Sequence, residues 1–190
     1  MNLESIPLFN LKDSDYVLDV GGGHVPFSRT NVIVDKFPEK EFDQPQRANC
    51  PIKIPEGAKF IKADAASMPF IKDKEFDFVI CAETLNHVED PIAVCSEIIR
   101  VGKRGYIEIP GVLHEIFVSH LEHLWVCLWD GKTLKFIRNN YPENTIGGLN
   151  QGIKIKDYRI QNEGWRILNL YRKLIYIEFV WEGNFNYELI

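Results

Sequence analysis

The chain has 190 residues, of which 45% are hydrophobic, and a formal net charge of -5. A chain of this length most often folds as one domain, and this apolar fraction is enough for a sizeable core. The negative charge argues against a nucleic-acid partner, because binding to phosphate backbones needs a basic surface. We therefore expect one domain over residues 1–190.

The cellular location follows from what the sequence lacks. Met1 is followed by NLESIPLFNLKDSD, which has neither the basic start nor the long apolar run of a secretory signal. No run of about 18 uncharged apolar residues is present. The four cysteines are widely spaced and form no CxxC pair, so they predict neither a disulfide framework nor a zinc ribbon. We expect a cytoplasmic protein with reduced thiols and no membrane partner.

The first half of the chain alternates short apolar runs with turns. Runs that are apolar on both faces are typical of parallel strands covered by helices, so an α/β fold is expected for this half. The runs lie at residues 16–20, 31–35, 58–64, 76–83 and 105–110.

One helix is marked clearly, between the last two of these runs. Asp90 is a suitable N-cap and Pro91 suits the first helical position. Apolar residues recur at helical spacing up to Ile99, and Gly102 ends the pattern. The sequence therefore predicts a helix from Pro91 to about residue 101.

From residue 111 onward the pattern becomes antiparallel. Residues 124–138 predict an additional β-hairpin that turns at Asp130-Gly131, and residues 174–190 predict a second hairpin that turns near 182–184. We expect residues 1–110 to form a cofactor-binding half and residues 111–190 a substrate-side half. The aromatic residues of the hairpins suggest a homodimer.

A run of three glycines, Gly21 to Gly23, follows the first predicted strand. Glycines at this point let backbone N–H groups approach a ligand closely. Asp19 directly precedes them, Asp35 ends the second strand, and Asp64 ends the third. A carboxylate after the second strand can accept hydrogen bonds from a ribose diol. These features predict a nucleotide-like ligand at the carboxyl edge of the sheet.

Five stretches in order resemble the motifs of class I S-adenosylmethionine (SAM)-dependent methyltransferases, above all the methyltransferase type 11 group. They are VLDVGGG, VIVDKF, KADAASMPF, FDFVICAETLNHVEDP and EIIRVGKRGYIEIP, between residues 15 and 110. The resemblance implies a Rossmann-like, seven-stranded, mostly parallel sheet with an antiparallel C-terminal hairpin. It also implies SAM as the cofactor.

The resemblance assigns the cofactor-binding residues. Asp19, Gly21, Gly22 and Gly23 would border the amino-acid end of SAM; Asp35 and Lys36 would hold the ribose; Asp64 and Ala65 would face the adenine; Cys81 and Glu83 would lie beside the methionine part. Asp35 and Asp64 could instead be caps of strand ends, and Cys81 is explained equally well as a core residue.

The chain departs from the family pattern after the glycines. Only eight residues separate Gly23 from Val32, whereas a parallel crossover normally takes about a dozen residues and includes a helix. The first helix is therefore expected to be much reduced. A dinucleotide oxidoreductase is an alternative, but its third motif glycine is replaced by Pro26 and its helix is absent.

Histidines provide the candidates for catalysis. His87 follows the fourth strand and is expected to act as a base or to contact the acceptor; it could instead cap the following helix. His114 and His123 lie after the fifth strand, where substrates enter, in a group that also contains His120, Glu115 and Glu122. This group could equally support the hairpin. A metal interpretation of these histidines is also open, but His120 and His123 give no recognised zinc pattern, so no metal is expected.

The function expected from these features is O- or N-methylation of a small-molecule acceptor. A general base is needed only where the acceptor atom is protonated at neutral pH. The alternative is a catalytically silent binding or scaffold protein with the methyltransferase fold, which the shortened crossover favours and the retained Asp19, Asp35 and Asp64 oppose.

Overall fold

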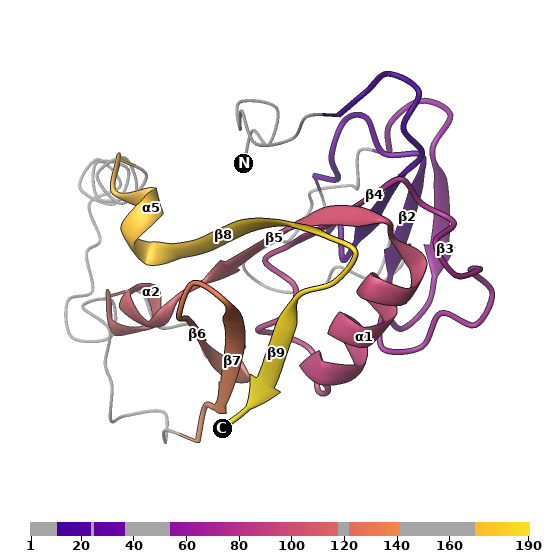
Figure 1. Cartoon of the computed structure of the whole chain (residues 1–190). Coiled ribbons are helices and arrows are strands. Elements are labelled where there is room, and N and C mark those ends of the chain that lie inside the picture. The colour runs from indigo at the N-terminus through magenta and orange to yellow at the C-terminus, as the bar shows by residue number, and fades with distance from the viewer. Residues whose placement is uncertain (1–10, 24, 37–53, 118–121, 141–169) are drawn as a thin grey trace.

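The main element of the computed structural model is a six-stranded sheet with the order β3-β2-β1-β4-β5-β8 (Figure 1). The first five strands along the chain are parallel, and β8 pairs with β5 in the antiparallel sense. The strands are β1 (Val17–Val20), β2 (Val32–Asp35), β3 (Lys59–Lys62), β4 (Phe78–Ala82), β5 (Arg104–Pro110) and β8 (Tyr176–Glu182). The structure describes residues 11–23, 25–36, 54–117, 122–140 and 170–190.

Alternate side chains of the parallel strands fill a core on each face of the sheet. On one face, residues such as Leu18 and Val79 pack with α1 (Pro91–Val101). On the other face, Val17 and Phe78 belong to a smaller core. Burial on both faces explains why the inner strands β1, β2 and β4 are mostly apolar rather than alternating with polar residues.

The predicted helix is confirmed as α1. Asp90 Oδ1 accepts the N–H of Ala93 at 2.9 Å, Pro91 occupies the first turn, and Gly102 is the C-cap. The side chain of Asp90 thus satisfies one of the backbone donors that a helix start leaves unpaired.

A second, three-stranded sheet packs on the same side as α1 (Figure 1). It has the order β6-β7-β9, formed by β6 (Trp125–Trp129), β7 (Thr133–Arg138) and β9 (Asn186–Leu189). The hairpin expected over residues 124–138 is confirmed as the antiparallel pair of β6 and β7. Asp130 Oδ1 accepts the N–H groups of Lys132 and Thr133 at its turn.

The expected seven-stranded sheet with a C-terminal hairpin is wrong in the described part of the chain. β8 and β9 are joined at Gly183, which has a φ of +72°, but β9 leaves β8 and pairs with β7 in parallel. Aromatic packing explains the departure, since the ring centroid of Phe185 lies 5.4 Å from that of Phe179 and 5.6 Å from that of Trp181. The end of the chain folds over this aromatic cluster and completes the small sheet.

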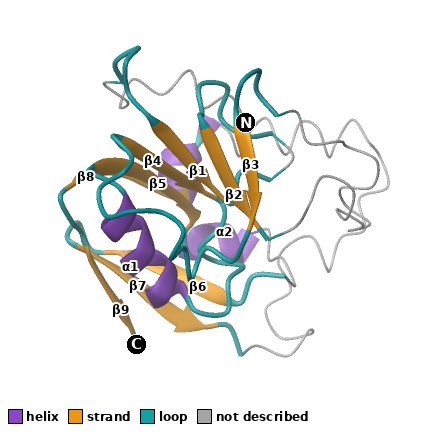
Figure 2. Cartoon of the chain, turned by 90° about the vertical axis from the view of Figure 1, so that its right-hand side faces the viewer, coloured by secondary structure: helices purple, strands orange, loops and turns teal. Residues whose placement is uncertain are grey.

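One short helix lies beside β5 and β6 (Figures 1 and 2), and a second one lies beside it at the start of β8 (Figure 1). They are α2 (Val112–Phe117), which follows β5 directly, and α5 (Arg172–Ile175), which precedes β8. Among the helices in the described ranges, none is long and apolar enough to cross a membrane.

Candidate functional site

The glycine turn ties the end of β1 to the end of β4. Gly21 has a φ of +70°, and its N–H donates to the carbonyl of Val34 at 2.8 Å. The Thr84 hydroxyl lies 3.2 Å from the Val20 carbonyl and 3.3 Å from that of Gly21. A Cβ at Gly21 would lie 2.2 Å from the same hydroxyl oxygen, so this position requires glycine for its space as well as its backbone angle.

Asp19 is buried beneath this turn. Its Oδ2 accepts the N–H of Phe27 at 2.8 Å, and a Cβ built on Gly22 would lie 3.0 Å from the same oxygen. Burial raises the pKa of Asp19 from 3.8 to about 7; the Phe27 N–H lowers it, and the charge of Asp35 raises it further. The carboxylate therefore holds the chain after the turn and is poised to ionise when a cation approaches.

The ends of β2 and β3 contribute the next acidic groups. Asp35 is buried, and its Oδ2 accepts the N–H of Gly23 at 3.1 Å. Lys36 Nζ lies 3.6 Å from Asp64 Oδ2, and Asp64 Oδ1 accepts the N–H of Ala66 at 2.9 Å. Asp35 thus accepts a hydrogen bond from the glycine turn, whereas Asp64 lies at the surface and accepts one from the turn that follows β3.

Of the residues at the end of β4, some lie in the core and others at the edge of the sheet. The Cys81 side chain is fully buried among core residues, and burial raises the pKa of its thiol. Ala65 also packs in the core. Glu83 has a φ of +53°, which is uncommon for a residue other than glycine, and its N–H donates to the carbonyl of Glu108 at 2.9 Å. Strained backbone of this kind clusters at functional sites.

A buried ionic network lies next to Glu83. Arg172 Nη2 contacts Glu108 Oε1 at 2.5 Å, and the Tyr106 hydroxyl donates to Glu108 Oε2 at 2.9 Å. Burial raises the pKa of Glu108, while the Arg172 guanidinium opposes that rise. Burial and the charge of Glu83 raise the pKa of the Tyr176 hydroxyl. No local pattern predicts this network, because its members come from β5, α5 and β8.

The three candidate histidines lie close together beyond the carboxyl ends of β4 and β5. The His87 and His123 rings meet edge to face with centroids 4.7 Å apart, and the His114 and His123 centroids are 5.9 Å apart. Backbone pairing brings the segments together, since the N–H of Leu124 donates to the Asn86 carbonyl at 2.8 Å. His120 lies outside the described residues.

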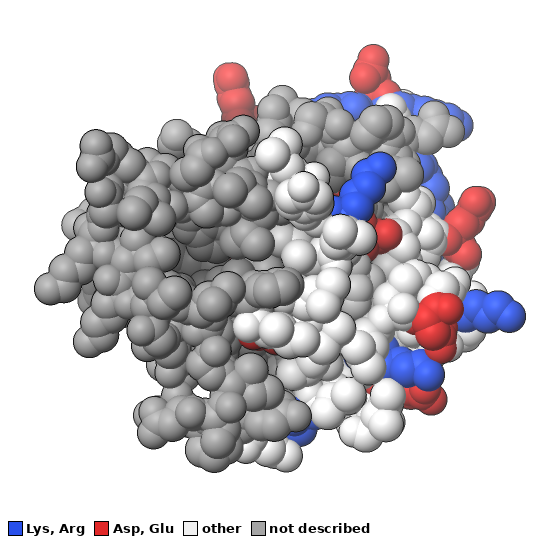
Figure 3. All heavy atoms as spheres, turned by 90° about the vertical axis from the view of Figure 1, so that its left-hand side faces the viewer, with Lys and Arg blue, Asp and Glu red and all other residues white. Residues whose placement is uncertain are grey.

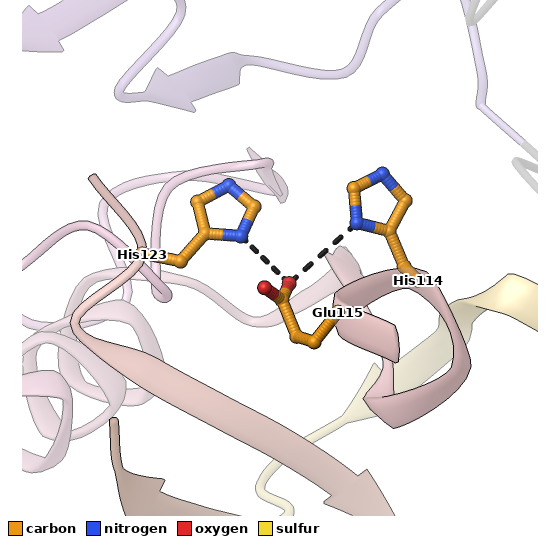
Figure 4. Close-up of side chains that lie close together, drawn as sticks. All are labelled: His114, Glu115 and His123. Atoms are coloured by element: carbon orange, nitrogen blue, oxygen red, sulfur yellow. Dashed lines mark hydrogen bonds and ion pairs between the residues drawn. The ribbon is translucent and has the colours of Figure 1, made fainter. Parts of the chain in front are cut away.

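The role of Glu115 in this cluster was missed by sequence reasoning, which grouped the residue with the histidines but assigned it no function. Its Oε1 lies 2.6 Å from His123 Nδ1 and 3.5 Å from His114 Nδ1, so the two imidazoles approach one carboxylate oxygen (Figure 4). All three residues are buried. Burial would raise the pKa of Glu115, but the two histidines hold it at about 2. Its position next to His114 in the sequence was the available signal.

Asn86 is a second residue that was missed. Its side chain is fully buried, and neither its Oδ1 nor its Nδ2 has a hydrogen-bond partner among the described residues. Buried amides of this kind are rare, and each calls for a ligand, a water molecule or another explanation. It lies between Thr84, which contacts the glycine turn, and His87.

The comparisons with known proteins agree with this arrangement. Residues 18–107, which extend from β1 into β5, match the family model described as a methyltransferase domain. This match, over somewhat less than half of the chain, supports a class I SAM-dependent methyltransferase and implies SAM as the cofactor. No curated protein sequence matches the chain.

Several solved structures are similar. One chain of the complex between the Haloferax volcanii Trm112 methyltransferase activator and a proposed methyltransferase is 15% identical, with a TM-score of 0.53; the match covers 96% of this chain and 87% of that one. The YcgJ protein of Bacillus subtilis is 21% identical over 60% of this chain and 57% of its own, with a TM-score of 0.43. A SAM-dependent methyltransferase of Thermotoga maritima, described as a possible histamine N-methyltransferase, is 24% identical, with a TM-score of 0.40. The match covers 58% of this chain and 50% of that one. The chain thus spans only about half the length of the last two.

The residues at the sheet edge fit SAM by their chemistry. The turn at Gly21 and Gly23 has positive φ angles, which bring backbone close to a ligand without a Cβ between them. Two buried carboxylates, Asp19 and Asp35, stand beside it. A ligand with an amino group and a ribose diol offers the cation and the donors that these carboxylates accept.

We predict that Gly21→Ala destabilises the protein far more than Gly57→Ala. Both glycines have a positive φ, but a Cβ at Gly57 meets nothing within 4 Å, so only the backbone strain of about 1 kcal/mol applies there. The clash with Thr84 should raise the cost at Gly21 to about 3 kcal/mol. Urea unfolding of both variants measures the difference, and equal costs would show that the Thr84 contact is unimportant.

We also predict that Asp19→Asn becomes increasingly stabilising, relative to wild type, between pH 4 and pH 7. The folded pKa of about 7 exceeds the usual 3.8, so the folded state holds the proton more tightly and wild-type stability falls as pH rises through this range. The difference should approach about 4 kcal/mol above pH 7, because each pKa unit corresponds to about 1.4 kcal/mol. Unfolding midpoints at four pH values test it; a difference independent of pH would contradict a raised pKa.

Proposed function

We propose that the chain is an active SAM-dependent methyltransferase that methylates an oxygen or nitrogen atom of a small-molecule acceptor. The main support for the proposal is the Asp19 carboxylate, which is buried beneath the glycine turn with Asp35 nearby. Two neighbouring carboxylates at the carboxyl edge of a parallel sheet favour a ligand that brings a positive charge and hydroxyl groups. SAM carries both.

The cofactor assignments follow the order of the strands. Asp19 and the glycine turn would bind the amino-acid end of SAM, Asp35 and Lys36 the ribose, and Asp64 the adenine. The buried side chains of Ala65 and Cys81 support contacts through their backbone rather than through their side chains. Glu83, at the end of β4, would border the methionine part.

The acceptor would enter beside His87, His114 and His123. When bound, SAM supplies a methyl group on a sulfonium ion, and the chain must align the acceptor atom with it. His87 Nδ1 lies 3.1 Å from the Glu122 carbonyl oxygen, which can only accept, so Nδ1 carries the proton in this contact. In the neutral form of the ring the lone pair would be at Nε2, and His87 is the proposed base for a hydroxyl acceptor.

The proposed acceptor is a small molecule for two reasons. The net charge of -5 disfavours nucleic acid, and the described chain outside residues 18–107 is largely taken up by β8, two short helices and the small sheet. The face that carries α2 and α5 is mostly uncharged at its described centre (Figure 3). Its exposed apolar side chains include Ile116 and Leu174, which supports an apolar acceptor or the homodimer suggested above.

A silent scaffold with the same fold is the second candidate. The described residues between β1 and β2 form turns and no helix, which supports a weakened site, since a helix N-terminus can assist a bound anion. In addition, one oxygen of Asp35 already accepts the Gly23 N–H. SAM binding separates the two candidates.

We predict that calorimetry detects SAM and its demethylated product binding to wild type at about micromolar Kd. Asp35→Asn keeps an oxygen for the Gly23 N–H but removes the charge that holds the ribose, and should weaken binding at least about tenfold, or 1.4 kcal/mol. Asp73→Asn is the matched control, because Asp73 is an exposed partner of Arg100 and lies outside the proposed cofactor contacts. Absence of binding to wild type would favour the scaffold.

A transfer assay tests the reaction itself. We predict that methyl-labelled SAM passes label to a pool of small hydroxyl or amine compounds. His87→Ala should lower the rate at least about tenfold, because general-base catalysis typically contributes that much or more, while the SAM affinity stays unchanged. A variant with full rate on a hydroxyl acceptor would exclude His87 as the base.

A further inference from the structure

We propose that His114, Glu115 and His123 bind a divalent transition-metal ion, with Zn²⁺ as the representative. The three side chains come from α2 and from the segment just before β6. One ligand atom from each residue lies within 4.8 Å of the others. The sequence places Glu115 in the same group as the histidines, but their spacing matches no recognised zinc pattern and did not predict this site.

The distances suit an ion of this size. Zinc–nitrogen bonds of about 2.0–2.1 Å and zinc–oxygen bonds of about 2.0–2.2 Å place neighbouring tetrahedral ligands roughly 3.4 Å apart. Two distances in the site bracket that value. Glu115 Oε1 lies 2.6 Å from His123 Nδ1 and 3.5 Å from His114 Nδ1. An ion would be admitted if the shorter contact opened by less than about 1 Å and the widest pair of ligand atoms, which lie within 4.8 Å of each other, closed by up to about 1.4 Å.

The burial of Glu115 supplies an independent observation. The residue is 7% exposed, and its Oε2 has no hydrogen-bond partner among the described residues. Leaving a buried carboxylate oxygen unpaired costs free energy that a structural hydrogen bond would normally recover. A bound cation would compensate for this cost.

Neighbouring groups hold the two imidazoles in place. The Asn139 side chain donates to the His123 carbonyl at 2.9 Å, and the His87 ring packs edge to face on His123. The Tyr176 ring lies 5.2 Å from the His114 ring. Support of this kind fixes ligand orientation, which a metal site needs for affinity.

The donor set selects the class of ion. Two imidazoles and one carboxylate suit Zn²⁺, Co²⁺ or Fe²⁺, whereas Mg²⁺ and Ca²⁺ prefer oxygen ligands alone. Three protein ligands leave at least one position for water or for a donor atom of the acceptor. An ion here would lie beside His87 at the acceptor side; this last role alone rests on the proposed function.

Cobalt binding tests the site directly. Tag-free protein, treated with a chelator and dialysed, is titrated with Co²⁺ while visible absorption is recorded, and Zn²⁺ is then added as competitor. We expect one equivalent of Co²⁺ to bind with a Kd below about 10 µM and to be displaced by Zn²⁺. Zn²⁺ should also raise the thermal midpoint of wild type, and chelator should reverse the rise.

Substitutions assign the ligands. Glu115→Gln and His123→Ala should each weaken Co²⁺ binding at least about 100-fold, since even indirect partners of metal ligands contribute 10–100-fold. Glu89→Gln is the matched control, because Glu89 is an exposed carboxylate that pairs with Arg138, and it should stay within about threefold of wild type.

Two results would overturn the metal site. Wild type that binds no Co²⁺ and shows no thermal shift with Zn²⁺ would mean that Glu115 only orients the imidazoles by hydrogen bonds. Binding that survives both ligand substitutions would place the ion elsewhere. The wild-type thermal shift decides the matter even where a variant fails to fold. A SAM titration in chelator then tests the proposed function separately, since SAM binding there does not require the ion.

Discussion

The close contact between Gly21 and the Thr84 hydroxyl is the constraint on which the candidate site depends. It joins the ends of β1 and β4, and the turn it fixes lies over the Asp19 carboxylate and brings the Gly23 N–H to Asp35. Thr84 also begins the segment that contains Asn86 and His87. The cofactor side and the acceptor side are therefore connected through one packed contact, and a change at Gly21 would disturb both.

Local signals in the sequence predicted the parts of the fold that local interactions decide. Apolar runs predicted the five parallel strands, and Asp90 with Pro91 predicted the start of α1. The glycine turn and Asp35 were predicted because parallel strands bring their carboxyl ends to one edge. Placing these residues required only strand order, which the family resemblance supplied.

The remaining features depend on contacts between distant segments, and no local pattern contains them. β9 was expected to pair with β8, but the packing of Phe185 with Phe179 and Trp181 directs it to β7. Glu115 was grouped with the histidines but given no role, because spacing cannot show that a side chain on α2 meets His123, eight residues later. Periodicity tells which face of an element is buried and gives no partner for a single polar group.

The two most informative carboxylates are both buried at a cost in stability. Asp19 has its pKa raised by burial, and Glu115 leaves one oxygen without a partner in the described chain. Apolar residues at either position would pack without a desolvation penalty, so folding alone does not explain these groups. A ligand that brings positive charge to each would recover the free energy that folding gives up. The proposed cofactor at the end of β1 and the proposed ion at α2 would thus each neutralise a buried carboxylate of this chain.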